Sequence, residues 1–476
     1  MSLRCSLAVA GRSVLPGLLL FLPFPVHAQQ GPPNAPVSTV ATPAPAHRDR
    51  SSVPAVQSGQ AQSPVSQTNP DEPAPAPGDE QHSQLDQSGV RMSFYYVADV
   101  LAAPKGVDPT PENWWGRIRG TIDFDFGKFT PDKGLGGHIT SLWQYGTNIG
   151  ATNYVGSYAN PSSLASQHVF RAAEYSLSQY LLHDHLEFRG GKIATWDSYG
   201  VQEYGQSFIN EPMGYAFNTF ANTYMTYDPG GTPAFEMRVL PNHHWYAKAI
   251  VLSQEKAPYN IDGNGFGFHF GPPAVAAEAG YLHDPPLPPD STAALGRENF
   301  IRSSETGPWP GVFKFGGSYN PGVFINLLSG RPSPGNYILW GQASQVVYRE
   351  PGQGPDGHRG LGVTSTVDWS PNDVNPENQQ IDVGLRYVGL IRGSHFANDM
   401  LDVGWVRTSN GSAYRAYLFS RGQGDHVSEH LVEVNYLAHV TSKLLLQPTA
   451  EYIVRPAADP RRENVFVCGF RIMASF

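Results

Sequence analysis

Cysteine is nearly absent from this 476-residue chain, which contains Cys5 and Cys468 and no others. Cys5 lies in a stretch with the pattern of a removed export signal, so the mature chain is expected to keep a single cysteine and no internal disulfide. Stability must then come from strand pairing and packing. Cys468 is expected to be a buried, unreactive thiol.

Long hydrophobic runs are also missing. No stretch beyond the N-terminal region offers the roughly 18 consecutive apolar residues that a transmembrane helix needs. Charged residues make up only 15% of the chain and the net charge is -9, which argues against a nucleic-acid partner for the chain as a whole. Mean hydropathy is -0.32, yet the chain holds 50 Gly, 23 Tyr and 24 Phe. This combination favours a β-barrel, in which half of each strand is polar.

Composition predicts three regions. Arg4 and Arg12 precede the apolar run Val14–Phe24 and the small-residue site Val26-His27-Ala28, so residues 1–28 are expected to be a secretory signal peptide. Residues 29–89 are dominated by Pro, Ala, Ser and Gln and hold few large apolar side chains. Such a segment is expected to be a disordered periplasmic linker, and its role stays open. Residues 90–476 are expected to form the folded domain.

The last twelve residues, 465–476, alternate between two kinds of side chain. Phe466, Cys468, Phe470, Ile472, Ala474 and Phe476 share one face, whereas Arg471 lies on the other. That pattern suits a strand with hydrocarbon on one side and a wet lumen on the other. An open strand edge in lipid would leave backbone groups unpaired, so the edge should close a barrel. Phe476 is the expected signal for the outer-membrane assembly machinery. An edge strand of a secreted soluble β-protein is the alternative.

Strand and turn patterns continue from residue 90 to the end and predict an all-β fold. We expect a transmembrane antiparallel β-barrel of about sixteen strands, of the outer-membrane porin type. Two long connections, Gln144–His168 and Trp196–Thr232, suit the extracellular side. A third, Asp284–Pro310, is long where a periplasmic turn is expected, so its topology stays open. The candidate strands are Arg91–Val100, Trp115–Phe126, Gly137–Tyr145, Phe170–Leu182, His185–Thr195, Pro233–Leu240, Trp245–Gln254, Val275–Leu282, Val312–Tyr319, Tyr337–Tyr348, Leu361–Trp369, Gln380–Leu390, Met400–Val406, Glu429–Ala438, Leu444–Tyr452 and Val465–Phe476.

Charged residues alternate with apolar ones in many of these candidates. In the second candidate, Ile118, Ile122 and Phe124 share one face, and the charged residues share the other. In a barrel the charged face lines the lumen. Both signs of charge recur, without a predominance of cations. The expected pore-lining, substrate-contacting residues are Arg117, Arg119, Asp123, Asp125, Glu187, Arg189, Glu236, Arg238, Asp382, Arg386, Glu433 and Arg471.

Three stretches in the second half of the folded region have a family pattern: Gly360–Gly393 (GLGVTSTVDWSPNDVNPENQQIDVGLRYVGLIRG), His430–Pro456 and the terminal strand with its final Phe. These stretches resemble the OprB family of carbohydrate-selective porins. Val346–Pro351, Phe313–Gly322 and, more loosely, Gly190–Pro212 fit the same pattern. The similarity runs in order from about Gly89 to Phe476. The chain departs from the family at Gly389–Ser394, which reads GLIRGS, and in the insert Asp284–Pro310.

The resemblance implies a sixteen-stranded barrel in the bacterial outer membrane that passes glucose-like monosaccharides and small polyols by diffusion. Expected partners are outer-membrane lipid and neutral sugars, and an oligomer is possible. No cofactor is expected. A barrel of this size needs an inward-folded segment for selectivity, and Trp196–Thr232 is the best candidate. Aromatic residues could stack on sugars or form interfacial girdles instead. These residues are Trp114, Trp115, Trp143, Trp196 and Tyr199.

Other functions stay open at this point. A general or anion-selective porin without sugar preference is one, although 32 Lys and Arg against 41 Asp and Glu argue against a cationic lining. A hydrolase inside the barrel is another, because His183, His185, His243 and His244 are available, but no nucleophile motif accompanies them. His183 and His185 could also share a strand face and bind a metal, but no further ligand is nearby, and a solvated turn is preferred.

Overall fold

The structure is a computed structural model of the whole chain. It describes residues 88–476 except 108–111, 151–153, 165–167, 183–184, 217–221, 227–229, 243, 255–264, 269, 285–308, 353–358, 394–395 and 442. The chain divides into two units, 1–52 and 53–476, and the described residues belong to the second. The predicted signal peptide, residues 29–87 of the predicted linker, His183, His243 and most of the insert 284–310 lie outside the described residues.

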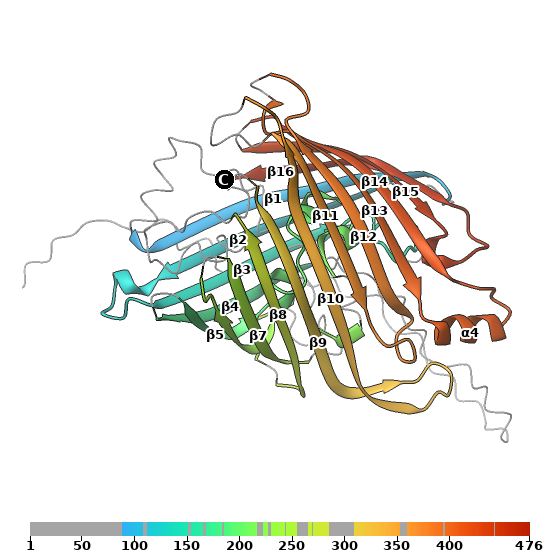
Figure 1. The fold of residues 1–476 in the computed structure, drawn as a ribbon, viewed down its shortest axis with the longest axis horizontal. Helices are drawn as coiled ribbons and strands as arrows, with labels where there is room; N and C mark the ends of the chain where they lie inside the picture. Colours follow the sequence, from blue (N-terminus) through green and yellow to red (C-terminus); the bar gives the residue numbers. More distant parts are fainter. Residues whose placement is uncertain are drawn as a thin grey trace, which may run out of the picture. The chain divides into compact units, whose positions relative to one another are not determined.

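The described chain is built of strands joined by turns and a few short helices (Figure 1). The strands are β1 (Val90–Lys105), β2 (Glu112–Asp125), β3 (Leu135–Gly146), β4 (Val169–Leu181), β5 (Leu186–Ile193), β6 (Thr232–Val239), β7 (Trp245–Ser253), β8 (Pro273–His283), β9 (Gly311–Ile325), β10 (Pro332–Arg349), β11 (Gly360–Trp369), β12 (Glu377–Val388), β13 (Met400–Asn410), β14 (Ser428–His439), β15 (Leu444–Val454) and β16 (Val465–Ser475). The helices are the α-helix α4 (Ser412–Ser420) and the 3-10 turns η2 (Phe126–Lys128), η3 (Thr195–Asp197), η4 (Tyr204–Ser207), η5 (Pro212–Gly214) and η7 (Pro456–Ala458). Among the described residues, no helix is both long and apolar enough to cross a membrane.

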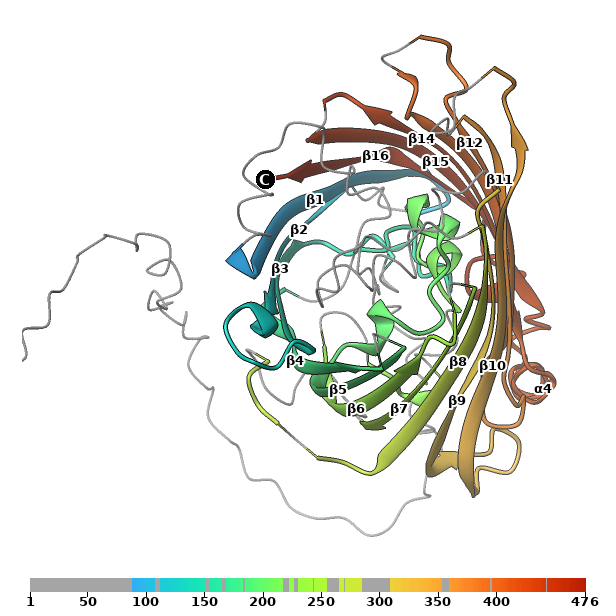
Figure 2. The same ribbon diagram turned by 60° about the vertical axis from the view of Figure 1, so that its left-hand side comes forward.

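Each strand pairs antiparallel with its neighbours in the chain, and β1 pairs with β16 to close a sixteen-stranded barrel (Figure 2). Closure leaves no unpaired strand edge, which removes the cost of exposed backbone groups. In the closing register Asp99 lies opposite Arg471. All of the predicted strands are present in the predicted order, so the predicted fold class and strand count are confirmed.

The largest difference from the predicted boundaries is in the hairpin of β9 and β10. The expected strands end at Tyr319 and begin again at Tyr337, but pairing continues to Ile325 and Pro332. Prolines and glycines in this stretch break the alternating pattern and led to the shorter prediction. The hairpin accommodates them with a register shift between Pro334 and Asn336, where a proline without an N–H does not interrupt a regular ladder.

Side chains alternate between the two faces of the wall as predicted. In β16, Val465, Val467 and Arg471 point inward and are buried, whereas Phe470 and Ile472 lie on the outer face and are partly exposed. Cys468 is also on the outer face and is partly exposed, so the expectation of a buried thiol is wrong. Large apolar side chains such as Leu177, Phe235 and Phe315 are exposed on the outside. The outer face thus has the apolar character that a hydrocarbon environment requires.

Two apolar clusters fill much of the barrel interior. One joins Trp196 and Tyr199 to Trp340 of β10 and Leu142 of β3. The other joins Phe208 and Ile149 to inward residues of β14–β16, among them Val467. These contacts explain why Val465 and Val467 occupy an inward face that was expected to be wet. The interior therefore holds packed chain segments, and these segments form the candidate site.

Candidate functional site

Two connections fold into the barrel. We call residues 147–168, between β3 and β4, the first inward loop, and residues 194–231, between β5 and β6, the second inward loop (Figure 2). The prediction that Trp196–Thr232 folds inward is confirmed. Both connections were expected to suit the extracellular side, and no inward fold was predicted for the first inward loop. Ile149, Val155 and Leu164 are buried in the interior clusters, so exposing this loop would return apolar surface to water.

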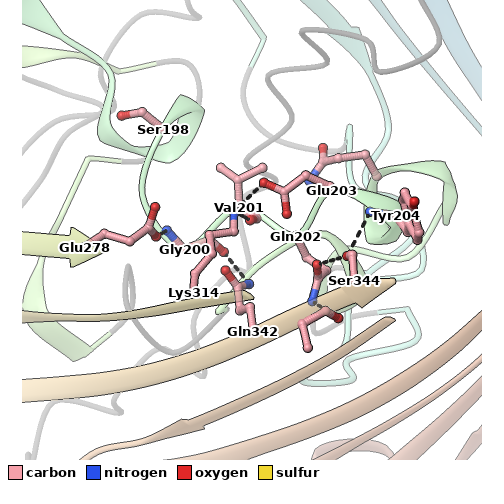
Figure 3. A network of polar contacts seen from close by, with 12 residues as sticks. Ser198, Gly200, Val201, Gln202, Glu203, Tyr204, Glu278, Lys314, Gln342 and Ser344 are labelled. Atoms are coloured by element: carbon pink, nitrogen blue, oxygen red, sulfur yellow. Dashed lines mark hydrogen bonds and ion pairs between the residues drawn. The ribbon is translucent and has the colours of Figure 1, made fainter. Parts of the chain in front are cut away.

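The start of the second inward loop is bound to the wall of β7–β11 by polar side chains (Figure 3). Glu278 of β8 accepts the Gly200 N–H at 2.9 Å, and Gln342 of β10 donates to the Gly200 carbonyl at 2.8 Å. Lys314 of β9 donates to the Val201 carbonyl and pairs with Glu203 at 2.5 Å. Backbone donors and acceptors that a loop inside a barrel would otherwise leave unpaired are satisfied here by the wall.

Gln202 extends this binding to three further wall positions. Its amide donates to the carbonyl of Ser365 at 2.8 Å and more weakly to that of Ala343 at 3.3 Å. Its amide oxygen accepts the Ser344 hydroxyl at 2.5 Å. A single side chain of the loop thus connects β10 and β11, which fixes the position of the loop along the wall.

The tip of the second inward loop rests on β12–β15. Glu433 of β14 accepts the N–H groups of Ile209 and Asn210, both at 2.8 Å, and the Asn210 side-chain amide at 2.6 Å. Gln380 of β12 donates to the carbonyls of Pro212 at 2.9 Å and Tyr215 at 3.1 Å. Asp382 accepts from Gln380 at 2.8 Å and orients it. Glu433 therefore binds the loop directly, whereas Asp382 acts through Gln380.

Glycines in the wall make room for the large side chains of this tip. Gly384 of β12 lies opposite Gly404 of β13, and both face the interior. A Cβ at Gly384 would lie 2.7 Å from the Met213 methyl group, and one at Gly404 would lie 2.6 Å from the Phe208 ring. At those separations atoms overlap, so the tip can seat against the wall only where side chains are absent.

The first inward loop is bound by β14 and by the connection after β15. Glu429 of β14 accepts the N–H groups of Tyr158 at 2.8 Å and Ala159 at 2.7 Å. The Arg462 guanidinium donates to the carbonyls of Val155 and Gly156, each at 2.6 Å. A carboxylate that meets N–H donors and a guanidinium that meets carbonyls are charge-assisted pairs, the stronger class of hydrogen bond.

The closing strands bind the end of the first inward loop. Arg471 of β16 pairs with Asp99 of β1 at 2.7 Å and donates to the Ser163 hydroxyl at 2.9 Å. Ser162 donates to Asp99 at 2.6 Å. The ion pair that joins the two ends of the barrel wall is therefore also a binding site for the loop.

The inward loops also bind each other. Ser163 N–H donates to the Ile209 carbonyl at 2.8 Å, and Glu211 N–H donates to the Asn160 carbonyl at 3.0 Å. Main-chain bonds of this kind join the two loops into one unit that is attached to the wall at several points. The two loops therefore occupy the barrel interior as one unit.

On β1–β6 the inward charges bind mainly to one another, in a series we call the charge belt. Asp123 pairs with Arg91 at 3.1 Å and with the His138 ring at 2.7 Å. Further along, Arg238 lies 3.2 Å from Glu187 and 3.5 Å from Glu236. Neighbouring strands thus carry opposite charges, which neutralise each other and support the register. The belt comprises Arg91, Asp123, His138, Glu174, Glu187, Arg189, Glu236 and Arg238.

The remaining predicted residues occupy several environments. Arg117 donates to the Leu164 carbonyl at 3.5 Å. The guanidinium carbons of Arg119 and Arg386 lie 5.8 Å and 5.4 Å from the ring centres of Trp196 and Tyr204. Asp125 is at the end of β2, where it caps η2 by accepting the Gly127 N–H at 3.0 Å.

Solvent reaches the predicted wall residues unevenly. All of the predicted set except Asp123 are buried, because the inward loops and the paired charges cover them. The expectation that these charged residues line an open, water-filled lumen is corrected accordingly. Arg91, Asp123 and His138 retain 31%, 17% and 17% side-chain exposure. This end of the charge belt is where the charged wall is open.

The aromatic candidates fall into two groups. Trp114 and Trp143 point outward and are exposed, near Tyr145 at the ends of β2 and β3. Their place at strand ends on the outer face is that of an interfacial girdle. Trp115, Trp196 and Tyr199 are buried in the interior, where Trp196 donates its indole N–H to Gly230 and closes the second inward loop.

No group of three or more metal-binding side chains occurs among the described residues. His185 has a structural partner, because its Nδ1 lies 2.6 Å from the Leu240 carbonyl. His244 is similarly placed, 3.1 Å from the Leu282 carbonyl. Both histidines thus lie in turns, where they support the backbone of the next strand.

Comparison with known protein families identifies the family to which this barrel belongs. A family profile described as "Carbohydrate-selective porin, OprB family" matches residues 115–476. The chain belongs to the OprB family. It is an outer-membrane carbohydrate-selective porin, so the expected class, fold and location are confirmed. No curated protein sequence matches it.

Solved structures of a family member have the same fold. Pseudomonas putida OprB at high pH matches with a TM-score of 0.71 and 17% identity, over 83% of this chain and 96% of that one. The low-pH structure of the same protein matches with a TM-score of 0.50 and 14% identity, over 84% of this chain and 98% of that one. At this identity the likeness shows the fold, while the side chains of this porin must be interpreted on their own.

Three residues that bind or support the inward loops and the wall were missed by the sequence reasoning. Lys248 and Glu278 are single charges in otherwise apolar strands, and they pair with each other at 3.2 Å. The isolated charge in each of these apolar strands could have identified Lys248 and Glu278 as inward residues with a partner. Glu429 gave a weaker signal, because the N–H groups it binds are about 270 residues away in the chain.

Proposed function

We propose that this porin passes neutral, glucose-like monosaccharides along the β1–β4 side of the barrel. The observation that carries the proposal is the open end of the charge belt, where Arg91, Asp123 and His138 keep solvent access while most other charges are covered. Thr121 lies beside them, with its hydroxyl 3.2 Å from that of Thr140. This group of donors and acceptors forms the proposed permeant-contacting surface.

The chemistry of this surface suits a sugar. A monosaccharide has no charge and offers neighbouring hydroxyls that both donate and accept hydrogen bonds. The Arg91 guanidinium supplies donors, and the Asp123 carboxylate supplies acceptors, in contact with each other at 3.1 Å. Because these charges are already paired with each other, a permeating ion would gain little interaction energy there. Weak, repeated hydrogen bonding allows a permeant both to enter and to leave.

The two inward loops have the role of narrowing the passage in this proposal. They are bound to the wall at several points, with β14 binding both of them, and they are bound to each other, so they can hold a fixed width without a cofactor or a catalytic group. The buried predicted residues, such as Glu433 and Arg471, then serve passage indirectly by holding the loops. Transport by diffusion, without catalysis, is the activity that follows.

We also propose that Phe476 is recognised during assembly. Its backbone N–H donates to the Phe94 carbonyl at 2.9 Å, which extends the pairing of β16 with β1. Its ring is exposed, so the side chain adds little to packing in the finished barrel. Removal of the ring is expected to lower the yield of folded barrel in the outer membrane and to leave the conductance of the barrels that do form unchanged.

Single-channel current across a planar bilayer, with glucose titrated in, tests the passage. The porin is expected to show saturable block, and Asp123→Asn is expected to weaken it about tenfold, because a lost charge-assisted hydrogen bond amounts to about 1.4 kcal/mol. Asp425→Asn, the same chemical change in an exposed loop, is the matched control and should leave block unchanged. Absence of block by any monosaccharide, together with strong anion selectivity in a salt gradient, would instead identify an anion-selective or general porin.

A further inference from the structure

The end of the β7–β8 connection forms an unusual feature on the outside of the barrel. The sequence Gly265-Phe266-Gly267-Phe268 is followed after His269 by Phe270 and Gly271. We call the described part, Gly265–Phe268 and Phe270–Gly271, the phenylalanine segment. The residues Phe266, Phe268 and Phe270 are 63%, 45% and 81% exposed. Three large apolar side chains at alternate positions would be costly if they faced water.

The phenylalanine segment is held against the outer face of β4 and β5. Tyr175 and Lys192 lie opposite each other in the β4–β5 pair and point outward, because the neighbouring Ser176 and Gly191 share the inward face. The Tyr175 hydroxyl donates to the Phe266 carbonyl at 2.8 Å, and its ring packs edge-on against Phe268 with centres 5.3 Å apart. These contacts place the segment over the wall.

The phenylalanine segment supplies hydrogen-bond partners for the outward-pointing Lys192. An outward lysine would face hydrocarbon, where a charge costs up to a few kcal/mol depending on depth. Its ammonium group instead donates to the carbonyls of Gly265 at 2.8 Å and Gly267 at 3.1 Å, and the residue is buried. Gly265 comes so close to β4 that a Cβ there would lie 2.3 Å from the Ala172 carbonyl, so glycine is required for this approach.

The segment continues the lipid-facing surface of the barrel. Below Tyr175 on β4 the outward Leu177 is exposed, and Phe235 of β6 stacks on Phe188 of β5 with ring centres 5.8 Å apart. Phe268 and Phe270, with centres 6.2 Å apart, extend this apolar area. The β7–β8 connection is at the same end of the barrel as both inward loops, since alternate connections of an antiparallel barrel share an end. Longer loops mark the outer side in barrels of this kind.

We propose that the phenylalanine segment is a docking surface for the hydrocarbon of the outer leaflet, attached to the barrel wall by Lys192. The paired ammonium and the exposed rings give the segment an apolar outer side and a polar inner side. It therefore widens the hydrophobic band of the porin locally, above the short strands β5 and β6, and fixes the depth of this side in the membrane.

Depth-dependent quenching tests the proposal on the full chain in lipid vesicles. Phe270→Cys, made in a Cys468→Ser background and labelled with bimane, should lose about half of its fluorescence when the acyl chains carry bromine, because rings of interfacial segments reach the acyl boundary. Leu328→Cys, at an exposed turn between β9 and β10, is the matched control and should respond to aqueous iodide instead. Equal quenching of the two labels by brominated chains would overturn the proposal.

Two further results decide the partner and the role of the lysine. A label at position 270 that is shielded from both quenchers, with cross-linked pairs of barrels, would identify a second copy of the chain as the occupant and overturn the lipid proposal. Lys192→Met keeps the strand apolar and removes the donor, so the label at 270 should become accessible to iodide while the barrel still forms. Unchanged quenching in Lys192→Met would overturn the attachment by Lys192.

Discussion

The two sides of the inner wall use buried charge in different ways. On β1–β6, cations and carboxylates alternate and pair with each other, as Arg238 does with Glu187 and Glu236. On β12–β15, Glu429 and Glu433 meet backbone N–H groups of the inward loops instead of cations. The charges of the first side are thus balanced mainly within the wall, whereas Glu429 and Glu433 are satisfied mainly by the loops.

This difference shows how a porin can hold a passage open on one side. Charges that are already paired with each other form fewer bonds to a loop, so a gap can persist beside the Arg91–Asp123 pair. Carboxylates that meet N–H donors, as Glu429 and Glu433 do, make strong bonds and draw the loops to that part of the wall. The passage proposed beside Asp123 and the loops seated on Glu433 are therefore two results of one distribution of charge.

Removal of the Glu433 carboxylate should have the largest effect. Glu433→Ala removes the acceptor of four hydrogen bonds, from the N–H groups of Ile209 and Asn210 and from two side-chain amides, at about 1 kcal/mol each, or about 4 kcal/mol in total. The tip of the second inward loop should detach, so single-channel conductance should rise and become noisy, and the unfolding midpoint in denaturant should fall.

Glu433→Gln is the control for that experiment, because it keeps the shape and one acceptor oxygen. It should give an intermediate loss of stability and a quieter channel than Glu433→Ala. If Glu433→Ala kept the conductance and the midpoint of the unmodified porin, the β12–β15 side would not be what holds the loops, and the comparison between the two sides would fail.

Breaking an ion pair on the β1–β6 side should lower the free energy of unfolding somewhat less and leave the loops in place. Arg238→Met removes the cation that lies between Glu187 and Glu236, which costs about 3 kcal/mol of stability for a broken buried pair. The double variant Arg238→Met/Glu187→Gln should recover part of that loss, since it removes the uncompensated carboxylate. Unfolding midpoints of the two single variants and the double variant give the coupling energy.

Conductance distinguishes this experiment from the previous one. Because Arg238 pairs with Glu187 and Glu236 within the charge belt, the channel of Arg238→Met should keep its open level and its low noise. A conductance rise as large as that of Glu433→Ala would mean that both sides position the loops, which contradicts the division drawn here.

The sequence predicted the strands of the barrel wall much better than the contacts that the inward loops make inside the barrel. Alternation with a period of two, as in Arg117 to Phe124 of β2, depends on neighbouring residues, and it placed each strand in order. The bonds between Glu429 and Tyr158 or between Glu433 and Ile209 join segments that are more than 200 residues apart. They exist only once the barrel has closed, so no local pattern contains them. Charged residues were placed on the correct face, but which would be covered by loops could not be derived.

The smallest effect is expected at an exposed ion pair that belongs to neither side of the wall. Arg415 of α4 donates to Asp425 at 2.7 Å, and its hydrogen bonds lower the pKa of Asp425. The half-exposed Asp425 carboxylate is screened by water, so Asp425→Asn should cost only about 0.3 kcal/mol at neutral pH.

The pH dependence of this pair follows from the sign of the shift. A lowered pKa in the folded state means that the stabilisation is present above the unfolded value of about 3.9 and is lost as the pH falls through the folded value. Denaturant midpoints of Asp425→Asn and the unmodified porin should therefore differ slightly at pH 7 and converge below about pH 4. A loss at pH 7 comparable with that of Arg238→Met would show that burial is not what separates strong from weak charge pairs in this barrel.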